Sequence, residues 1–253
     1  MKAHVTCIII HWNTPADLRQ QLATLTSTPE LKIVVVDNAS EGGVSSLKKK
    51  FSKVSFIENQ TNHGFARACN QGMEVAHTKW LLFLNPDVAV DASSVAEMIQ
   101  FAENYSLDAV SPEPSPEQKH LYKKPLPTAP NLLIEFSPLH RLFKPFGRKH
   151  TLTGGCLLIK KSVLKEVGGW DEDFFLWFED SDLTKRLYKA KKKLGWYPHS
   201  VDHRGGQSVK TLSKHEQKRL FFQSMQLYAK KHFTISGRLL VRLLRRMNTA
   251  KSA

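Results

Sequence analysis

The sequence predicts an α/β protein with a Rossmann-like, mainly parallel sheet flanked by helices, followed by a C-terminal helical extension. Over the first 110 residues, short apolar runs rich in Val, Ile, Leu and aromatic residues alternate with stretches of helical spacing. Such alternation is typical of a sheet whose strands are joined by covering helices. The 253 residues, of which 41% are hydrophobic, can bury a full core within one domain.

Each run in this first part can be assigned to an element. Strands are predicted over residues 4–10, 32–36, 54–57, 80–84 and 107–110. Helices are predicted between them, over residues 15–26, 44–51, 64–77 and 92–104, and Pro15 suits a first helical turn. Because ligands of open α/β sheets bind beyond the carboxyl ends of the strands, we expect Asn13, Asp37 and Asp87 to lie at the binding edge.

Residues 111–150 interrupt the alternation. They contain eight of the 12 prolines, so neither a helix nor a central strand is expected over much of this segment. Eight apolar side chains argue against a solvated linker: Leu132, Leu133, Ile134, Phe136, Leu139, Leu142, Phe143 and Phe146. We therefore expect a loop that is ordered, either by itself or by a substrate. A strand over residues 151–159 and a helix over 161–167 then resume the core.

The segment from Gly168 to Asp182 combines six carboxylates with five large aromatic residues. Apolar surroundings and neighbouring negative charges both raise carboxyl pKa values, and such groups are the usual source of a general base. The alternative is an acidic loop before a helix whose first turn carries Glu179, Asp180 and Asp182. Negative charge at that position is favourable against the helix dipole.

Two further polar groups stand apart from this acidic segment. Asn85-Pro86-Asp87 follows the apolar run 80–84, and His203 lies in a glycine-bearing loop, His-Arg-Gly-Gly-Gln-Ser. Taken alone, the first is an ordinary turn and the second a structural histidine. In chain order, however, an aspartate after a strand, a carboxylate pair at a helix start and a distal histidine form a known constellation.

Several motifs occur in the order and spacing found in the inverting family 2 glycosyltransferases of the GT-A fold, and the chain resembles this family over about residues 5–208. In chain order they are Val-Val-Val-Asp-Asn-Ala-Ser at 34–40, Asn-His-Gly-Phe-Ala-Arg-Ala-Cys-Asn-Gln-Gly at 62–72, Asn-Pro-Asp at 85–87, Thr-Gly-Gly at 153–155, Gly-Gly-Trp-Asp-Glu at 168–172 and Glu-Asp-Ser-Asp-Leu at 179–183. One departure is that Asn85 stands where the family has the first aspartate of its metal-binding Asp-x-Asp. The Asn-Pro-Asp form resembles the rhamnosyltransferase-like members.

The resemblance implies metal-dependent, inverting transfer of a sugar from a nucleotide-diphosphate sugar, dTDP-rhamnose or a UDP-hexose, to an acceptor hydroxyl. Asp180 is the implied general base. Asp87 and His203 are the implied ligands of Mn²⁺ or Mg²⁺, which would stabilise the diphosphate leaving group. The segment 111–150 would cover the acceptor side. The implied acceptor contacts or supports of the base are Glu179, Asp182, Trp170 and Asp171.

The donor side of the site is implied in the same way. Asp37 could accept the N3–H of uracil or thymine, a proton that cytosine lacks, and an Asx-turn at the strand end is compatible with that role. Gly64 would allow close approach of the backbone. The implied donor-binding residues are Asn13, Asp37, Asn62, Gly64, Phe65, Asn85 and Asp87.

Positive charge is concentrated near the C-terminal end. The net charge is +14, and residues 185–253 hold 18 Lys or Arg against two acidic residues. Ser213 and Glu216 form a capping box that predicts a helix. After Gly237, apolar residues are expected on one helix face with arginines around the rest: Leu239, Leu240, Leu243, Leu244 and Met247, with Arg238, Arg242, Arg245 and Arg246. Such a helix can lie in a membrane interface, or its leucines can pack back onto the protein.

These features predict the organisation and location of the protein. We expect a catalytic domain over residues 1–210, with a nucleotide-sugar-binding half (1–110) and an acceptor-binding half (111–210), followed by basic amphipathic helices over 211–253. Three dispersed cysteines favour a reduced compartment, and neither a signal peptide nor a membrane span is recognised. The expected location is either the cytoplasm or the inner face of the cytoplasmic membrane, with a bacterial surface glycan or lipid-linked acceptor as substrate.

Two other classes of function explain fewer of these features. A nucleotidyltransferase would share the sheet and the metal, but expects a glycine-rich phosphate loop near the first strand, where this chain has Ile-Ile-His-Trp-Asn-Thr-Pro. A nucleic-acid-binding protein would use the basic C-terminal part, but the acidic aromatic segment would have no role and would repel phosphate. Nucleic acid is therefore not expected as a partner.

Overall fold

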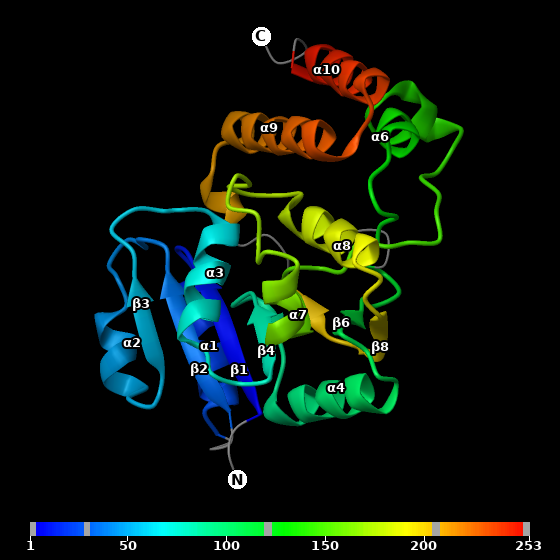
Figure 1. The fold of residues 1–253 in the computed structure, drawn as a ribbon. Coiled ribbons are helices and arrows are strands. Elements are labelled where there is room, and N and C mark those ends of the chain that lie inside the picture. Colours follow the sequence, from blue (N-terminus) through cyan, green and yellow to red (C-terminus); the bar gives the residue numbers. More distant parts are fainter. Residues whose placement is uncertain (1–3, 28–30, 119–122, 204–207, 250–253) are drawn as a thin grey trace.

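A seven-stranded sheet forms the centre of the molecule (Figure 1). The computed structural model describes residues 4–27, 31–118, 123–203 and 208–249, and leaves the side chains of residues 202, 203 and 249 undescribed. In chain order the strands are β1 (Val5–His11), β2 (Lys32–Asp37), β3 (Ser55–Glu58), β4 (Trp80–Leu84), β6 (Ala109–Glu113), β7 (Cys156–Lys160) and β8 (Leu194–Ser200). Their order across the sheet is β3-β2-β1-β4-β7-β6-β8.

The sheet is mainly parallel, as the sequence predicts. β1 pairs in parallel with β2 and β4, β2 with β3, and β6 with β8. β7 is the exception, because it runs antiparallel to both of its neighbours, β4 and β6. A separate two-stranded ladder joins β5 (Val88–Ala89) to β9 (Asp202–His203) in antiparallel register. The predicted fold class is confirmed.

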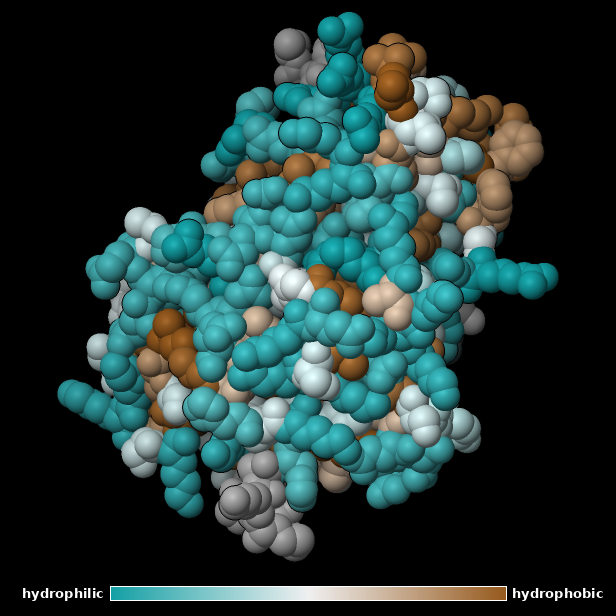
Figure 2. Space-filling model, in the orientation of Figure 1, coloured by the Kyte–Doolittle hydropathy of each residue, from teal (hydrophilic) through white to brown (hydrophobic). Residues whose placement is uncertain are grey.

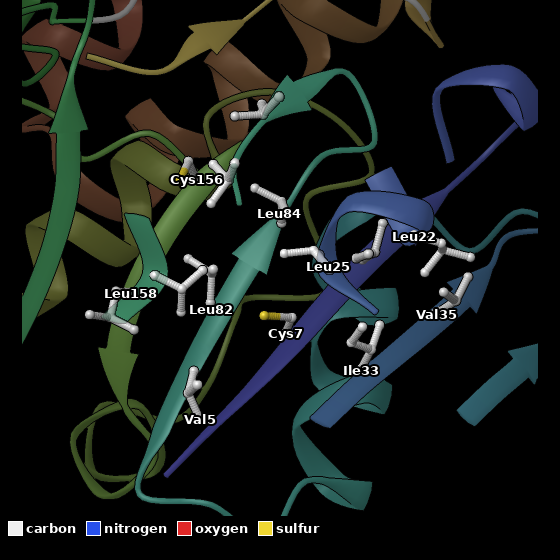
Figure 3. Packing of buried hydrophobic residues seen from close by; sticks show 14 of the residues in the cluster. Val5, Cys7, Leu22, Leu25, Ile33, Val35, Leu82, Leu84, Cys156 and Leu158 are labelled. Atoms are coloured by element: carbon white, nitrogen blue, oxygen red, sulfur yellow. The ribbon is translucent and has the colours of Figure 1, made fainter. Parts of the chain in front are cut away.

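Helices cover both faces of the sheet. On one face α1 (Pro15–Leu25), α2 (Ser45–Lys50) and α4 (Ala92–Asn104) pack against the strands. Figure 3 shows Leu22 and Leu25 of α1 over Cys7 and Val35. On the other face α3 (Phe65–Val75), α7 (Lys161–Glu166) and α8 (Glu179–Lys189) bury residues such as Cys69, Leu164 and Leu187. The central strands are apolar on both faces, since both are covered.

A third packed layer holds the C-terminal helices against the rest of the chain (Figure 1). It consists of α6 (Ala129–Phe136), α9 (Lys214–His232), α10 (Ile235–Thr249) and the aromatic stretch before α8. Ser213 caps α9 by accepting a hydrogen bond from the backbone N–H of Glu216, as the capping box predicts. Phe222, Met225 and Tyr228 on one side of α9 are buried.

The proline-rich segment is more regular than its composition predicts. α6 forms within it because Pro130 occupies the first helical turn, where a missing N–H removes no hydrogen bond, and Thr128 caps the helix by accepting from Asn131. A 3₁₀ turn (Pro138–Arg141) follows after a second capping residue, Ser137. The prediction of little helix here was therefore wrong for residues 129–141.

Strand boundaries also differ from the predictions. Residues 151–155 form a loop, and β7 starts at Cys156, because Gly154 and Gly155 turn the chain before it enters the sheet. The strand predicted at 107–110 is displaced to β6, where Pro112 and a register shift beside it are tolerated near the end of pairing with β8. The edge strand β8 and the β5–β9 ladder have no counterpart in the predicted elements.

The predicted single leucine face of α10 divides into two. Val241 and Leu244 are buried against the third layer, while Leu239, Leu243 and Met247 are exposed. The helix begins at Ile235, so Gly237 lies inside it, and a Cβ at that position would be 3.0 Å from Phe233 and 3.3 Å from Ala129. Within the described residues, no helix is both long and apolar enough to cross a membrane.

Candidate active site

The carboxyl ends of β1 and β2 place a buried histidine beside a buried aspartate. His11 and Asp37 are register partners, and Nδ1 of His11 lies 2.8 Å from Oδ1 of Asp37. The backbone N–H of Thr14 donates to Nε2 of His11, so the proton of the neutral imidazole is on Nδ1 and points at Asp37. Burial disfavours the charge of Asp37, but hydrogen bonds from His11 and Ser40 outweigh it and lower its pKa. Asp37 is therefore held as an oriented carboxylate.

The loops after these strands are tied together by side-chain amides. Asn13, in a left-handed conformation at φ 54°, donates its N–H to Ser40 and accepts from the N–H of Glu41. Asn38 reaches further along the edge, and its amide donates to the carbonyl of Gly64. These bonds connect the end of β2 to the start of α3. Three of the predicted donor-binding positions, Asn13, Asp37 and Gly64, therefore belong to one polar network.

The start of α3 requires a glycine. Gly64 has φ +84°, and a Cβ there would lie 2.5 Å from the carbonyl oxygen of Phe175. The same carbonyl accepts the N–H of Phe65, and Oδ1 of Asn62 accepts the N–H of Gly64. The Asn62–Phe65 motif thus packs directly against the acidic aromatic segment, 110 residues later in the chain.

Asn85 and Asp87 follow β4 at the same edge of the sheet. The N–H of Asn85 donates to the carbonyl of Gly155, and Asp87 is buried, with 5% of its surface exposed. His203 pairs with Val88 in the β5–β9 ladder, which brings its backbone next to Asp87. The side chain of His203 lies outside the described residues. Among those that are described, no group of three His, Cys, Asp or Glu residues forms a metal cage.

The two carboxylates that open α8 have raised pKa values. Glu179 is 8% exposed, and burial together with the neighbouring Asp180 raises its pKa. One of its carboxylate oxygens has no hydrogen-bond partner among the described residues. Burial also raises the pKa of Asp180, against hydrogen bonds from Ser181 and the backbone of Gly154 that favour the charged form. A pair of carboxyls that resists ionisation is the usual setting of a general base.

A large cavity runs past these carboxylates. It has a volume of about 830 Å³ and is lined by Glu179, Asp180, Asn85, the Thr153–Gly155 loop and the segment from Lys123 to Pro145. Aromatic side chains, including Phe65 and Trp177, form part of its wall. The proline-rich segment therefore forms part of the wall of the cavity that Asp180 lines.

The other acidic candidates have partners inside the protein. Asp182 is 1% exposed and binds Nε2 of His232 at 2.6 Å and Nε of Arg186 at 2.7 Å. Trp170 is also 1% exposed, edge-on against Phe65 and Phe83. The described lining of the cavity includes neither of them, and does not include Asp171, which pairs with Lys231 of α9. These three residues therefore pack within the protein, and their two predicted roles stay predictions.

His11 and His232 are the residues of this region that sequence reasoning did not find. Each is buried and each orients a carboxylate, Asp37 in the first case and Asp182 in the second. Since β1 and β2 were both predicted as neighbouring parallel strands, the position of His11 at the end of one and Asp37 at the end of the other could have indicated their contact. No such signal exists for His232, which is 50 residues from Asp182.

Raised carboxyl pKa values predict a pH-dependent effect of Glu179→Gln on stability. The folded chain binds a proton at Glu179 that the unfolded chain releases above a pKa of about 4.3. Burial of this carboxyl therefore costs stability increasingly as pH rises from there to about 8. Glu179→Gln should raise the free energy of unfolding at pH 8 relative to wild type and change it little at pH 4. Urea unfolding at both pH values measures this, and an equal effect at both would contradict it.

The family model described as glycosyl transferase family 2 matches residues 6–168, well over half of the chain. The chain belongs to glycosyltransferase family 2. A second model, described as the N-terminal domain of galactosyltransferase, matches residues 138–208, which include Asp180 and His203. The predicted family is confirmed.

Curated relatives are distant in sequence. A poly-β-1,6-N-acetyl-D-glucosamine synthase of Staphylococcus epidermidis is 25% identical over 207 residues, which is 78% of this chain but 48% of that protein. An N-acetylglucosaminyl-diphospho-decaprenol L-rhamnosyltransferase of Mycobacterium tuberculosis is 24% identical over 226 residues, covering 75% of this chain and 70% of the relative. The chain thus spans about half the length of the first of these relatives.

Solved structures share the fold. A mannosyltransferase from Pyrobaculum calidifontis, in complex with GDP-Man and Mn²⁺, aligns over 96% of this chain and 69% of its own with a TM-score of 0.62 at 15% identity. TarS from S. aureus, in complex with UDP-GlcNAc, aligns over 90% and 66% with a TM-score of 0.58 at 17% identity. Both are GT-A proteins that bind nucleotide sugars, and the similarity extends over nearly the whole described chain.

Proposed function

We propose that the chain is an inverting glycosyltransferase in which Asp180 deprotonates an acceptor hydroxyl held in the cavity. The observation that carries this proposal is the position of Asp180. It lines the large cavity beside Asn85, at the sheet edge where Asp37 and Asp87 also end their strands. A carboxyl with a raised pKa at the wall of a substrate-sized cavity has both the reach and the basicity for this role.

The reaction follows from these positions. As Asp180 accepts the proton of the acceptor hydroxyl, the oxygen of that hydroxyl forms a bond to the anomeric carbon of the donor. The bond from that carbon to the diphosphate oxygen breaks on the opposite face, so the configuration inverts and a nucleoside diphosphate leaves. Burial raises the pKa of both Glu179 and Asp180, and their mutual repulsion opposes a second negative charge on the pair.

A divalent ion fits the residues near Asp87. The buried Asp87 directly precedes β5, and β5 pairs with the strand that carries His203. An oxygen and an imidazole ligand together with diphosphate oxygens suit Mn²⁺ or Mg²⁺. We propose Asp87 and His203 as the protein ligands. When bound, the ion supplies Lewis-acid stabilisation of the leaving diphosphate. The family match and the Mn²⁺ in the mannosyltransferase complex support this assignment.

For the donor we propose a UDP-hexose or dTDP-rhamnose, bound by Asn13, Asp37, Asn62, Gly64, Phe65, Asn85 and Asp87. The oriented carboxylate of Asp37 supports recognition of an N3–H, and the rhamnosyltransferase among the relatives supports the rhamnose alternative. For the acceptor we propose a bacterial surface glycan, such as that of lipopolysaccharide, or its lipid-linked precursor, reached from the inner face of the cytoplasmic membrane.

Nucleotide selectivity tests the donor side of this proposal. Wild type should bind UDP and TDP well and GDP and CMP poorly, because only uracil and thymine offer the N3–H to Asp37. Asp37→Ala should weaken UDP and TDP binding by about 1.5–3 kcal/mol, the size of a hydrogen bond to a charged group. Calorimetric titration in Mn²⁺ measures both effects.

The control must separate binding from folding, since Asp37 also holds His11. Ser40→Ala removes one neighbour of His11 and Asp37 while keeping the carboxylate, and should retain selectivity for UDP and TDP. Urea unfolding of each variant shows that the protein used in the titration is folded. Equal affinity of wild type for GDP and UDP would contradict the role of Asp37.

A further inference from the structure

One face of α10 exposes large apolar side chains in a regular row. Ile235, Leu239, Leu243 and Met247 follow each other at intervals of four residues and have 74%, 56%, 54% and 46% of their surface exposed. Residues four apart lie above one another on a helix, so the four side chains form one continuous ridge. The opposite side of the helix is buried against the third layer, which fixes the direction of the ridge.

Positive charge borders this ridge. Arg238, Arg242 and Arg246 are exposed on α10, and their spacing of four places them in a second row beside the apolar one. The sequence contains no Asp or Glu after Glu216. The exposed surface of α10 therefore combines an apolar ridge with a row of exposed arginines, which is the arrangement of helices that lie in anionic membrane interfaces.

A second exposed apolar group lies beside α6. Leu142, Phe143 and Phe146 have 77%, 56% and 64% of their surface exposed. α6 connects the two groups, because its Asn131 donates to the carbonyl of Phe146 at one end and Asn248 of α10 donates to the carbonyl of Phe136 at the other. Figure 2 shows apolar side chains gathered at the upper right of the molecule, over α10, α6 and the segment that follows α6.

The same segment forms the rim of the cavity. Phe143, Lys144 and Pro145 are exposed to solvent and also line the cavity that contains Asp180. A surface that contacts this rim therefore lies at an entrance to the site. The lining also includes Lys124 and Glu135, which form an ion pair at 2.8 Å, so the cavity combines an apolar edge with a polar wall.

We propose that the α10 ridge and residues 142–146 together form a membrane-contact face, through which an amphiphilic acceptor enters the cavity from an anionic lipid bilayer. The term acceptor rests on the glycosyltransferase activity proposed above. The apolar ridge and the loop immerse in the interface while the arginine row contacts lipid phosphates. The hydroxyl that receives the sugar then reaches Asp180 without the lipid portion leaving the bilayer.

Vesicle partitioning tests the membrane-contact face. Full-length protein should co-sediment with vesicles that contain phosphatidylglycerol and bind phosphatidylcholine vesicles much less. Leu239→Ser combined with Leu243→Ser should reduce the partition coefficient by at least about tenfold, since two large apolar side chains are no longer buried in the interface. Val75→Ser combined with Tyr105→Ser is the matched control, because these side chains are 47% and 65% exposed but lie away from the proposed face.

A fluorescence measurement tests the rim separately. The tryptophan of Phe143→Trp should be quenched by brominated lipid in the vesicles, and that of Tyr105→Trp should not, after subtraction of the wild-type signal. Equal partitioning of wild type and the leucine variant, or an unquenched tryptophan at position 143, would overturn the proposal. Concentration-dependent dimerisation in sedimentation equilibrium that the leucine variant loses, without vesicle binding by wild type, would identify the face as a contact between two copies instead.

Nucleotide release in solution separates this inference from the proposed activity. Slow release of UDP or TDP from the donor in the absence of vesicles should be the same in wild type and the leucine variant. If wild type releases the nucleotide but does not bind vesicles, only the membrane-contact face is contradicted. If wild type binds vesicles but does not release the nucleotide, only the proposed function is contradicted.

Discussion

Asp180→Asn is expected to lower turnover by about 10² to 10⁴-fold, which is the usual contribution of a general base. The amide cannot accept the acceptor proton, yet it keeps the size of the side chain and its hydrogen bonds to Ser181 and the Gly154 loop. Donor affinity should change little, because the proposed donor-binding residues lie at the ends of β1, β2 and β4 or around the start of α3, whereas Asp180 lies at the start of α8. Initial rates and calorimetric titration of the donor measure the two quantities.

Glu179→Gln is the control for this substitution. It removes the neighbouring carboxyl but keeps the hydrogen-bonding capacity of a protonated Glu179, so turnover should stay within about an order of magnitude of wild type. If Glu179→Gln abolished turnover and Asp180→Asn did not, the base would be Glu179, and the assignment would be displaced by one residue.

Asp182→Ala is expected to destabilise the fold by about 3–5 kcal/mol, the cost of breaking a buried ion pair from one side. The carboxylate is 1% exposed and joins Arg186 of α8 to His232 of α9. Burial disfavours its charge, but these two partners outweigh that effect and lower its pKa. The loss should appear as a lower urea midpoint.

Asp173→Ala provides the comparison for that loss. Asp173 pairs with Lys231 of the same helix α9, but its side chain is 68% exposed, so the substitution should cost less than about 1 kcal/mol. A similar small cost for Asp182→Ala would show that the Asp182–His232 contact does not hold α9 in place.

The features that sequence could predict are those set by periodicity and by local chemistry. Helix α4 matches its predicted bounds because its apolar spacing is regular and Asp91 caps it by accepting from Ser94. Asn13, Asp37 and Asp87 end up at one edge because parallel strands all end there. The resemblance supplied the remaining candidates, and Asp180 does line a cavity of the size a substrate needs.

The features that sequence could not predict depend on contacts between distant parts of the chain. From the sequence alone, Asp182 is interpreted as a carboxylate in the first turn of a helix. Only the packing of α9 onto α8 shows that His232 binds it. α10 has five apolar residues that local spacing assigns to one side. Docking against α6 decides that Val241 and Leu244 are covered and that Leu239 and Leu243 are not. β8 is missed because its Gly195 and Pro198 weaken the strand pattern.

The central claim, that the chain cleaves nucleotide sugars at the sugar–diphosphate bond, is tested most directly by identifying the nucleotide product. Wild type is incubated with a panel of UDP- and dTDP-sugars in Mn²⁺ or in excess chelator, and the nucleotides are separated chromatographically. The account predicts UDP or TDP from at least one donor in Mn²⁺, little in chelator, and far less from Asp87→Ala. Release of UMP, TMP or pyrophosphate in place of the diphosphates, or full UDP or TDP release in chelator, would contradict it.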